Sequence, residues 1–218
     1  MVGFAGKRWC FLGNQRLRGS PRKSFDRRAW AEWFGCVDLP HKDLPKNAGN
    51  NIHPVYHWLE WFGAAECLTI DSNGKDRCLQ HDLNLPLPAS YYGRYDVVLN
   101  AGTSEHVWPN LQQVMRTCHD LCKPGGLILH AVPAHGCKRH GHWLCSAQWF
   151  KDLADRQFYK IEWLDEQPVP HKGGGENLYS LAIFRKLTDD PFSVRGWRAP
   201  ARNAGSPKCE LTNATPAA

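Results

Sequence analysis

The pair Glu105-His106 and the histidine- and cysteine-rich run from His135 to Cys145 hold the side chains best suited to chemistry. Imidazole titrates near neutral pH, so His106 is a candidate general base for an acceptor hydroxyl or amine. Glu105 is a candidate for binding an acceptor amine or for holding His106 in one tautomer. The structural alternative is a helix N-terminus, with Ser104 as its cap and a glutamate in its first turn.

The run from His135 to Cys145 places five potential metal ligands in eleven residues. Zinc takes such nitrogen and sulfur donors, but the spacing here matches no standard zinc finger. We therefore predict no metal site and expect His140-Gly141-His142 to contact a substrate or close over it, with Gly141 allowing close backbone approach. A plain structural loop and a zinc-binding loop are the alternatives. Glu105, His106 and His140 are thus the candidate catalytic residues.

Two aspartates follow short apolar runs further upstream. Asp71 comes directly after Glu66–Ile70, and Asp82 follows the brief run Arg77–Leu79. A carboxylate at the end of a strand can accept hydrogen bonds from a ligand. It can equally stabilise a turn or cap a helix, since Asp favours both positions.

The segment Tyr95–Pro133 predicts the unit that positions these residues. Its apolar runs Tyr95–Leu99 and Leu127–Val132 are typical of strands buried on both faces. Between them, apolar residues from Val107 to Cys122 recur at helical spacing, and Lys123-Pro124-Gly125-Gly126 ends the helix. A strand–helix–strand unit implies a parallel sheet, which binds ligands beyond the carboxyl ends of its strands. The polar stretch 100–106 lies at such an end.

The remaining elements follow from the same patterns. Before the central unit we expect a strand, a basic loop, a helix, an irregular insertion, a second helix and two short strands: Lys7–Gly13, Asn14–Lys23, Ser24–Phe34, Cys36–His53, Pro54–Phe62, Glu66–Ile70 and Arg77–Leu79. After it, Ser146 caps a helix over Ala147–Gln157, and strands follow at Phe158–Leu164 and Leu178–Phe184. We therefore predict one doubly wound α/β domain over residues 1–187 and a mostly disordered tail over residues 188–218.

Composition narrows the class of protein. No apolar run approaches the roughly 20 residues needed to span a bilayer, and the N-terminus lacks the core of a signal peptide. Nine cysteines, an odd number, suit a reducing compartment, so we expect a cytoplasmic protein. The net charge of +6 owes much to basic residues between Lys7 and Arg28. These could meet a nucleic-acid backbone, but no nucleic-acid-binding motif accompanies them.

In order and spacing, these motifs resemble those of the class I S-adenosylmethionine-dependent methyltransferase family. The matching pieces are Ile70-Asp71, Asp82-Leu83, Tyr95-Asp96-Val97-Val98 with the polar turn after it, and Leu121 to Gly126, the last similar to the family's Leu-Lys-Pro-Gly-Gly. The resemblance covers about Lys7 to Lys186. It implies a Rossmann-like, mostly parallel seven-stranded sheet with an antiparallel last strand.

The resemblance also implies a cofactor and its contacts. The cofactor is S-adenosyl-L-methionine, with Asp71 at the ribose, Asp82 and Leu83 at the adenine, and Ser72 as a further contact. The other cofactor-binding candidates lie at two strand ends: Gly13, Asn14 and Gln15, and Asn100, Ala101 and Gly102. The expected reaction is methyl transfer to a small molecule, since Asn100-Ala101-Gly102 lacks the motif typical of base-amine methylation.

One motif differs from the family pattern. Gly13-Asn14-Gln15 stands where the family has a Gly-x-Gly-x-Gly turn that lets backbone approach the cofactor. A second interpretation is therefore a methyltransferase-like binding protein without catalysis, associated with nucleic acid through its basic N-terminal segment.

Overall fold

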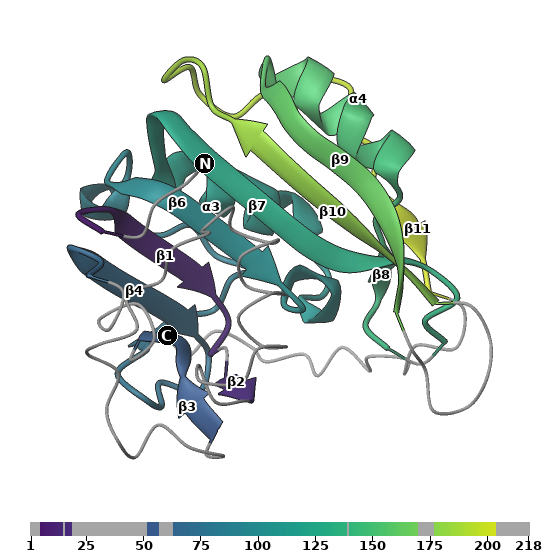
Figure 1. The fold of residues 1–218 in the computed structure, drawn as a ribbon. Coiled ribbons are helices and arrows are strands. Elements are labelled where there is room, and N and C mark those ends of the chain that lie inside the picture. Colours follow the sequence, from purple (N-terminus) through teal and green to yellow (C-terminus); the bar gives the residue numbers. More distant parts are fainter. Residues whose placement is uncertain are drawn as a thin grey trace, which may run out of the picture.

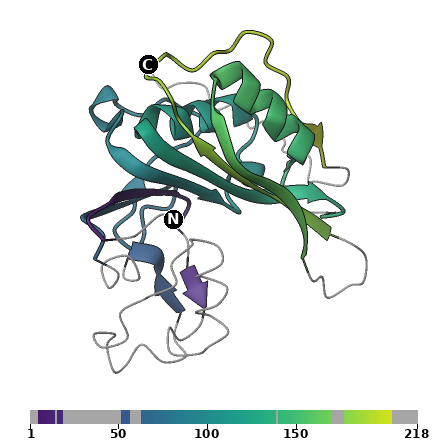
Figure 2. The same cartoon turned by 45° about the horizontal axis from the view of Figure 1, so that its top comes forward.

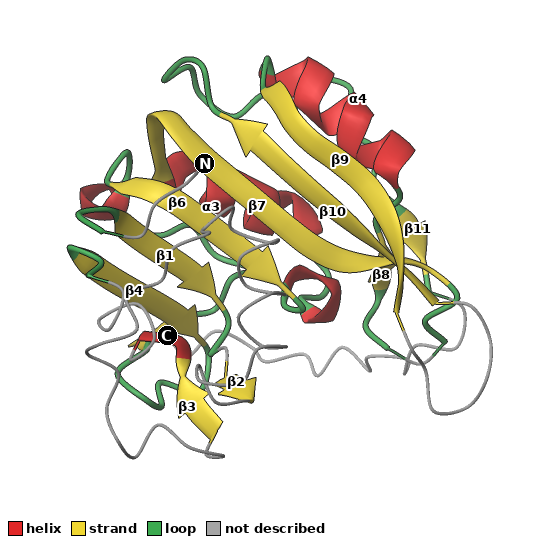
Figure 3. Ribbon diagram, in the orientation of Figure 1, coloured by secondary structure: helices red, strands yellow, loops and turns green. Residues whose placement is uncertain are grey.

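The computed structural model describes residues 5–14, 16–18, 52–56, 63–138, 140–169 and 177–203. Its elements, in chain order, are β1 (Arg8–Leu12), β2 (Arg16–Arg18), β3 (Ile52–Pro54), β4 (Glu66–Asp71), β5 (Leu79–Gln80), η1 (Ala89–Tyr91), β6 (Tyr95–Ala101), η2 (Ser104–His106), α3 (Leu111–Leu121), β7 (Cys122–His135), β8 (Trp143–Leu144), α4 (Ala147–Gln157), β9 (Lys160–Val169), β10 (Asn177–Arg185) and β11 (Ala201–Arg202). Figures 1 and 3 show their arrangement.

A seven-stranded sheet in the order β5-β4-β1-β6-β7-β10-β9 organises the molecule. The pairs β4–β5, β1–β4, β1–β6 and β6–β7 are parallel, whereas β10 runs antiparallel to both β7 and β9. The predicted mostly parallel sheet with an antiparallel last strand is confirmed. Because the strands β1, β4, β5 and β6 run in parallel, their carboxyl ends meet at one edge, where Figure 1 shows the arrowheads of β1, β4 and β6.

The central strands are buried on both faces. In β1, Cys10 and Leu12 belong to the main core cluster, and the alternating residues Trp9 and Phe11 are at most 1% exposed. Burial on both sides explains why this strand is a continuous apolar run rather than an alternating one. Register is consistent across the centre, with Trp9 opposite Val97 in β6.

Helices α3 and α4 pack on the same core (Figure 2). Asn110 caps α3 by accepting from the Gln113 amide at 3.1 Å, and Ser146 caps α4 by accepting from the Trp149 amide at 3.2 Å. The Ser146 cap was predicted from the sequence. The predicted helices Ser24–Phe34 and Pro54–Phe62 lie wholly or largely outside the described residues.

Several predicted boundaries are wrong. Arg16–Arg18, predicted as loop, forms β2 and pairs with β3, which was assigned to the insertion and the following helix. Lys123–Gly126 does follow the end of α3, but it belongs to β7 rather than to a free turn. Pro168, predicted in a loop, lies in β9; an edge strand accepts proline because one side of its backbone needs no partner.

The chain after Lys186 is packed as far as it is described, which corrects the start of the predicted tail. Phe192 is 6% exposed and belongs to the core cluster, while β11 pairs with β8. Polar, proline-rich composition predicted disorder here, but a few aromatic anchors suffice to hold such a segment. Residues 204–218 lie outside the described part, in which no helix is long and apolar enough to cross a membrane.

Candidate functional site

A crevice of about 530 Å³ opens at the carboxyl ends of the parallel strands. This volume falls within the roughly 300–1,000 Å³ typical of small-molecule sites. The lining residues come from the ends of β1, β4 and β6, from the segment after β5 and from the loop before β8: Gly13, Asn14, Ile70, Asp71, Ser72, His81, Asp82, Leu83, Asn84, Gly102, Thr103, His106, Val107, Trp108 and His142.

Asp71 ties the first turn of the crevice to the end of β4. Its Oδ2 accepts a hydrogen bond from the Asn14 amide at 2.7 Å, and its Oδ1 accepts from the Asn73 amide at 2.9 Å. Gly13 adopts the left-handed region, with φ of +84°, which lets the chain turn sharply after β1. The Asn14 side chain donates to Asp76 at 2.9 Å. A single glycine and an aspartate thus shape the turn that three glycines shape in the family pattern.

The predicted cofactor residues divide into three groups. Gly13, Asn14, Asp71, Ser72, Asp82, Leu83 and Gly102 line the crevice together. Asn100 and Ala101, the last two residues of β6, do not line the crevice. Gln15 lies outside the described residues. His142, expected to contact a substrate, also lines the crevice. The lining residues that were not predicted are adjacent in sequence to predicted ones, or nearly so: Ile70, His81, Asn84, Thr103, Val107 and Trp108.

Asn100 supports the site from beneath rather than facing it. Its side chain is fully buried, its Oδ1 accepts from the Ser104 amide at 3.0 Å, and its Nδ2 lies 2.8 Å from the Ser104 hydroxyl. The same Nδ2 lies 3.0 Å from Nδ1 of His130, which must therefore act as the acceptor. Burial lowers the pKa of His130 to about 3, so this ring stays neutral. Asn100 thereby fixes the start of η2.

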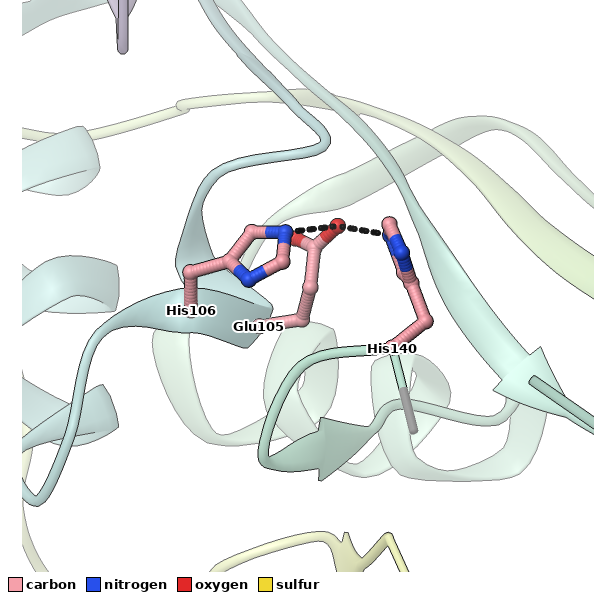
Figure 4. A group of neighbouring side chains, drawn as sticks. All are labelled: Glu105, His106 and His140. Atoms are coloured by element: carbon pink, nitrogen blue, oxygen red, sulfur yellow. Dashed lines mark ion pairs between the residues drawn. The ribbon is translucent and has the colours of Figure 1, made fainter. Parts of the chain in front are cut away.

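Glu105, His106 and His140 converge although they come from two separate segments (Figure 4). His106 Nε2 lies 3.8 Å and His140 Nε2 lies 3.4 Å from Glu105 Oε1. The Glu105 side chain is fully buried, whereas the two imidazoles are about half exposed. The neighbouring carboxylate raises the pKa of His140 against the opposing effect of its partial burial. The three residues predicted as catalytic therefore form one cluster.

The loop that carries His140 is fixed to η2 and to the end of the described chain. The His142 amide donates to the Glu105 carbonyl at 2.5 Å. Asn203, 5% exposed, donates through Nδ2 to the carbonyls of Cys137 at 2.7 Å and His140 at 2.9 Å. These bonds, made by residues distant in sequence, hold His140 against Glu105.

Aromatic rings form the wall beside His106. Trp108 lies 5.4 Å from His142 and 5.1 Å from Trp143 between ring centroids, and the Arg202 guanidinium lies 4.3 Å from the Trp108 ring centroid. Desolvation lowers the pKa of His142, with His106 and Arg202 adding to the effect. This side of the crevice is therefore aromatic, and Trp143 and Arg202 hold Trp108 in place.

The loop from His135 to Cys145 does not gather its own donors into a metal site among the described residues. Cys137 and Cys145 are buried, and Cys145 belongs to the apolar core. The one group of donors in the described chain close enough to share an ion is Glu105, His106 and His140. Neither thiol of this loop belongs to that group of donors.

Part of the chain is similar to a known family of proteins. Residues 63–130 match the family model described as a methyltransferase domain. The match covers less than half of the chain and, with the sheet order above, supports the predicted resemblance to the class I methyltransferase family. The match supports S-adenosylmethionine as the cofactor and methyl transfer as the activity. A search of curated proteins finds no match.

Three solved structures illustrate the range of similar proteins. An S-adenosylmethionine-dependent methyltransferase from Mesorhizobium loti is 13% identical, with a TM-score of 0.49 over 85% of this chain and 94% of its own. The 1,6-didemethyltoxoflavin-N1-methyltransferase of Burkholderia thailandensis is 13% identical, with a TM-score of 0.46 over 84% of this chain and 72% of its own. A 16S rRNA (adenine(1408)-N(1))-methyltransferase mutant from Catenulisporales acidiphilia is 9% identical, with a TM-score of 0.46 over 84% of this chain and 87% of its own. Likenesses this distant do not bear on the acceptor.

Proposed function

We propose that this protein transfers a methyl group from S-adenosylmethionine to a small-molecule acceptor that binds beside His106 and Trp108. The observation that carries the proposal is the mixed lining of one crevice, which holds Asp71 and Asp82 together with His106, Trp108 and His142. We assign the aspartates to an acidic, cofactor end and the other three residues to an acceptor end. A methyltransferase needs this arrangement, since it must hold a cofactor and an acceptor side by side.

The residues at the acidic end suit the cofactor. The Asp71 carboxylate already accepts two backbone hydrogen bonds, and its remaining lone pairs can accept two ribose hydroxyls. Leu83, 6% exposed, offers an apolar surface to the adenine next to Asp82. Gly13 and Gly102 carry no side chain, so the backbone beside Asn14 and after β6 leaves room for the methionine part. We therefore assign cofactor binding to these residues and to Ser72.

When bound, the cofactor's sulfonium supplies an activated methyl group, and the protein's task is to align the acceptor with it. Thr103 fixes the relative position of two strand ends, because its hydroxyl donates to the Leu12 carbonyl at 2.7 Å. At the other end, His106 lines the crevice and can meet an acceptor hydroxyl or amine, and the buried Glu105 carboxylate and His140 lie next to His106 without lining the crevice. We assign them to binding and orienting that group.

The aromatic wall supports a small, planar acceptor. Trp108 and its neighbouring rings give stacking surface, and such contacts contribute about 0.5–1.5 kcal/mol for each pair. Among the described residues, the crevice is lined by side chains of both polar and aromatic type over a volume that suits one cofactor and one small molecule. A non-catalytic binding protein is the alternative, and it would retain the acceptor end without turnover.

Two experiments test this proposal. The first is calorimetry with S-adenosylhomocysteine, and the second is a labelled methyl-transfer assay on a panel of small phenols, catechols and amines. We expect binding by the full chain and methyl transfer to at least one acceptor class. Asp155→Ala, an exposed carboxylate on α4 remote from the crevice, is the control and should bind as the wild type does. Absence of heat and of any thermal shift at millimolar ligand would overturn the cofactor assignment. Binding without turnover on any class would favour the alternative.

A further inference from the structure

The Glu105 carboxylate is the least expected feature of the acceptor end. The side chain is fully buried, and within the described part of the chain neither carboxylate oxygen has a hydrogen-bond partner. Burying a carboxylate without compensation is costly, so such groups are normally paired or bound to a metal. The two imidazoles nearby lie at 3.4 and 3.8 Å, which is ion-pair rather than hydrogen-bond distance.

The same three side chains have the geometry of an incomplete metal site. Their ligand atoms, one from each residue, all lie within 4.8 Å of one another. Ligands about 2.1 Å from a tetrahedral ion lie about 3.4 Å apart, so small side-chain rotations would bring the three donors onto one ion. Figure 4 shows both imidazoles turned toward the carboxylate from opposite sides.

We propose that Glu105, His106 and His140 bind a divalent transition-metal ion such as Zn²⁺ or Mn²⁺. Imidazole suits Zn²⁺, carboxylate suits Mn²⁺, and three protein ligands leave coordination positions open. His106 lines the crevice, so the open positions face the acceptor end. The inference deepens the proposed function, on which it rests for the identity of what meets the ion: an acceptor with an oxygen or nitrogen donor.

The surroundings are built to hold these donors in place. Asn100 fixes Ser104 at the start of η2, and the Glu105 carbonyl accepts from the His142 amide. Gly141 has φ of +72°, and a Cβ there would lie 2.6 Å from Cγ of Glu105, so only glycine lets the loop lie against the carboxylate. Asn203 then holds the loop carbonyl of His140 at 2.9 Å. Ligands fixed by a second layer of contacts are typical of metal sites.

The test is a Mn²⁺ titration of the full chain, purified without a histidine tag and followed by electron paramagnetic resonance. Mn²⁺ is the probe because thiols, of which this chain has nine, bind it poorly. We expect one bound Mn²⁺ per chain, released by Zn²⁺ because zinc binds such sites more tightly. Glu105→Gln, which keeps the side-chain volume, should weaken binding at least tenfold, as should His140→Asn. His135→Asn, an exposed histidine in the neighbouring segment, should bind as the wild type does.

Thermal unfolding distinguishes a metal site from a plain ion-pair cluster. In the presence of EDTA, Glu105→Gln should melt at or above the wild-type temperature, because it removes an uncompensated buried charge. Mn²⁺ should raise the melting temperature of the wild type and leave that of Glu105→Gln unchanged. No Mn²⁺ bound by the wild type at millimolar concentration, or equal binding by Glu105→Gln, would overturn the proposal. Neither measurement needs cofactor or acceptor. Failure of the metal-site proposal can therefore be distinguished from failure of the proposed function.

Discussion

Replacing Asp71 by alanine is the sharpest test of how the crevice holds its cofactor. In the structure, the two carboxylate oxygens accept the Asn14 amide at 2.7 Å and the Asn73 amide at 2.9 Å. The carboxylate therefore shapes the turn after β1 before any ligand binds. Asp71→Ala removes both this support and the lone pairs that face the crevice.

The size of the effect follows from these contacts. A hydrogen bond to a charged group contributes about 1.5–3 kcal/mol. Because Asp71 is partly exposed, water replaces some of the lost backbone bonds, and we expect the free energy of unfolding to fall by no more than about 2 kcal/mol. The lost ribose contact should weaken S-adenosylhomocysteine binding by about 1.5–3 kcal/mol, which is about a 10- to 150-fold rise in Kd.

Calorimetry and urea unfolding of the same samples separate the two effects. Asp71→Asn, which keeps one acceptor oxygen, should fall between the wild type and Asp71→Ala in both measurements. If Asp71→Ala loses stability but binds S-adenosylhomocysteine with unchanged affinity, the carboxylate serves only the turn and the ribose assignment is wrong.

Three further predictions concern the framework of the site. Gly141→Ala should lower the free energy of unfolding by about 1–3 kcal/mol more than Gly93→Ala in urea titrations, because both have positive φ but only Gly141 lacks room for a Cβ; equal losses would contradict this. Asn203→Ala should cost about 1–3 kcal/mol in the same assay by leaving buried carbonyls unpaired, and a loss below 0.5 kcal/mol (roughly the error of such work) would refute that role. Burial lowers the pKa of His119 to about 4 and that of His130 to about 3, so the unfolded chain takes up protons first as the pH falls. The contribution of each neutral imidazole to the free energy of unfolding is complete above about pH 6.5 and falls by about 2 kcal/mol by pH 5. His119→Gln should reduce the loss of stability between pH 7 and pH 5 in unfolding curves. An unchanged loss would count against this prediction.

Most of the sheet could be predicted because its central strands are buried on both faces. The apolar runs of β1, β4, β6 and β7 are legible without any partner, and the order of the acidic strand ends indicated the family. The short strands β2 and β3 could not be predicted, since each depends on pairing with a segment about 35 residues away. The segment 188–203 was misread for a related reason: its order comes from contacts of Phe192 and Asn203 with distant parts of the chain.

By itself, the sequence determined the fold class, the edge of the sheet where ligands bind and the residue types available there, because strand periodicity and turn residues are local properties. Only the tertiary structure decided which of those residues meet. Asn100 turned inward to support η2, while His140 reached Glu105 and His106 from a loop more than 30 residues away. That convergence depends on the pairing of β6 with β7 and on the Asn203 contacts, which act over long sequence separation. No local pattern encodes it.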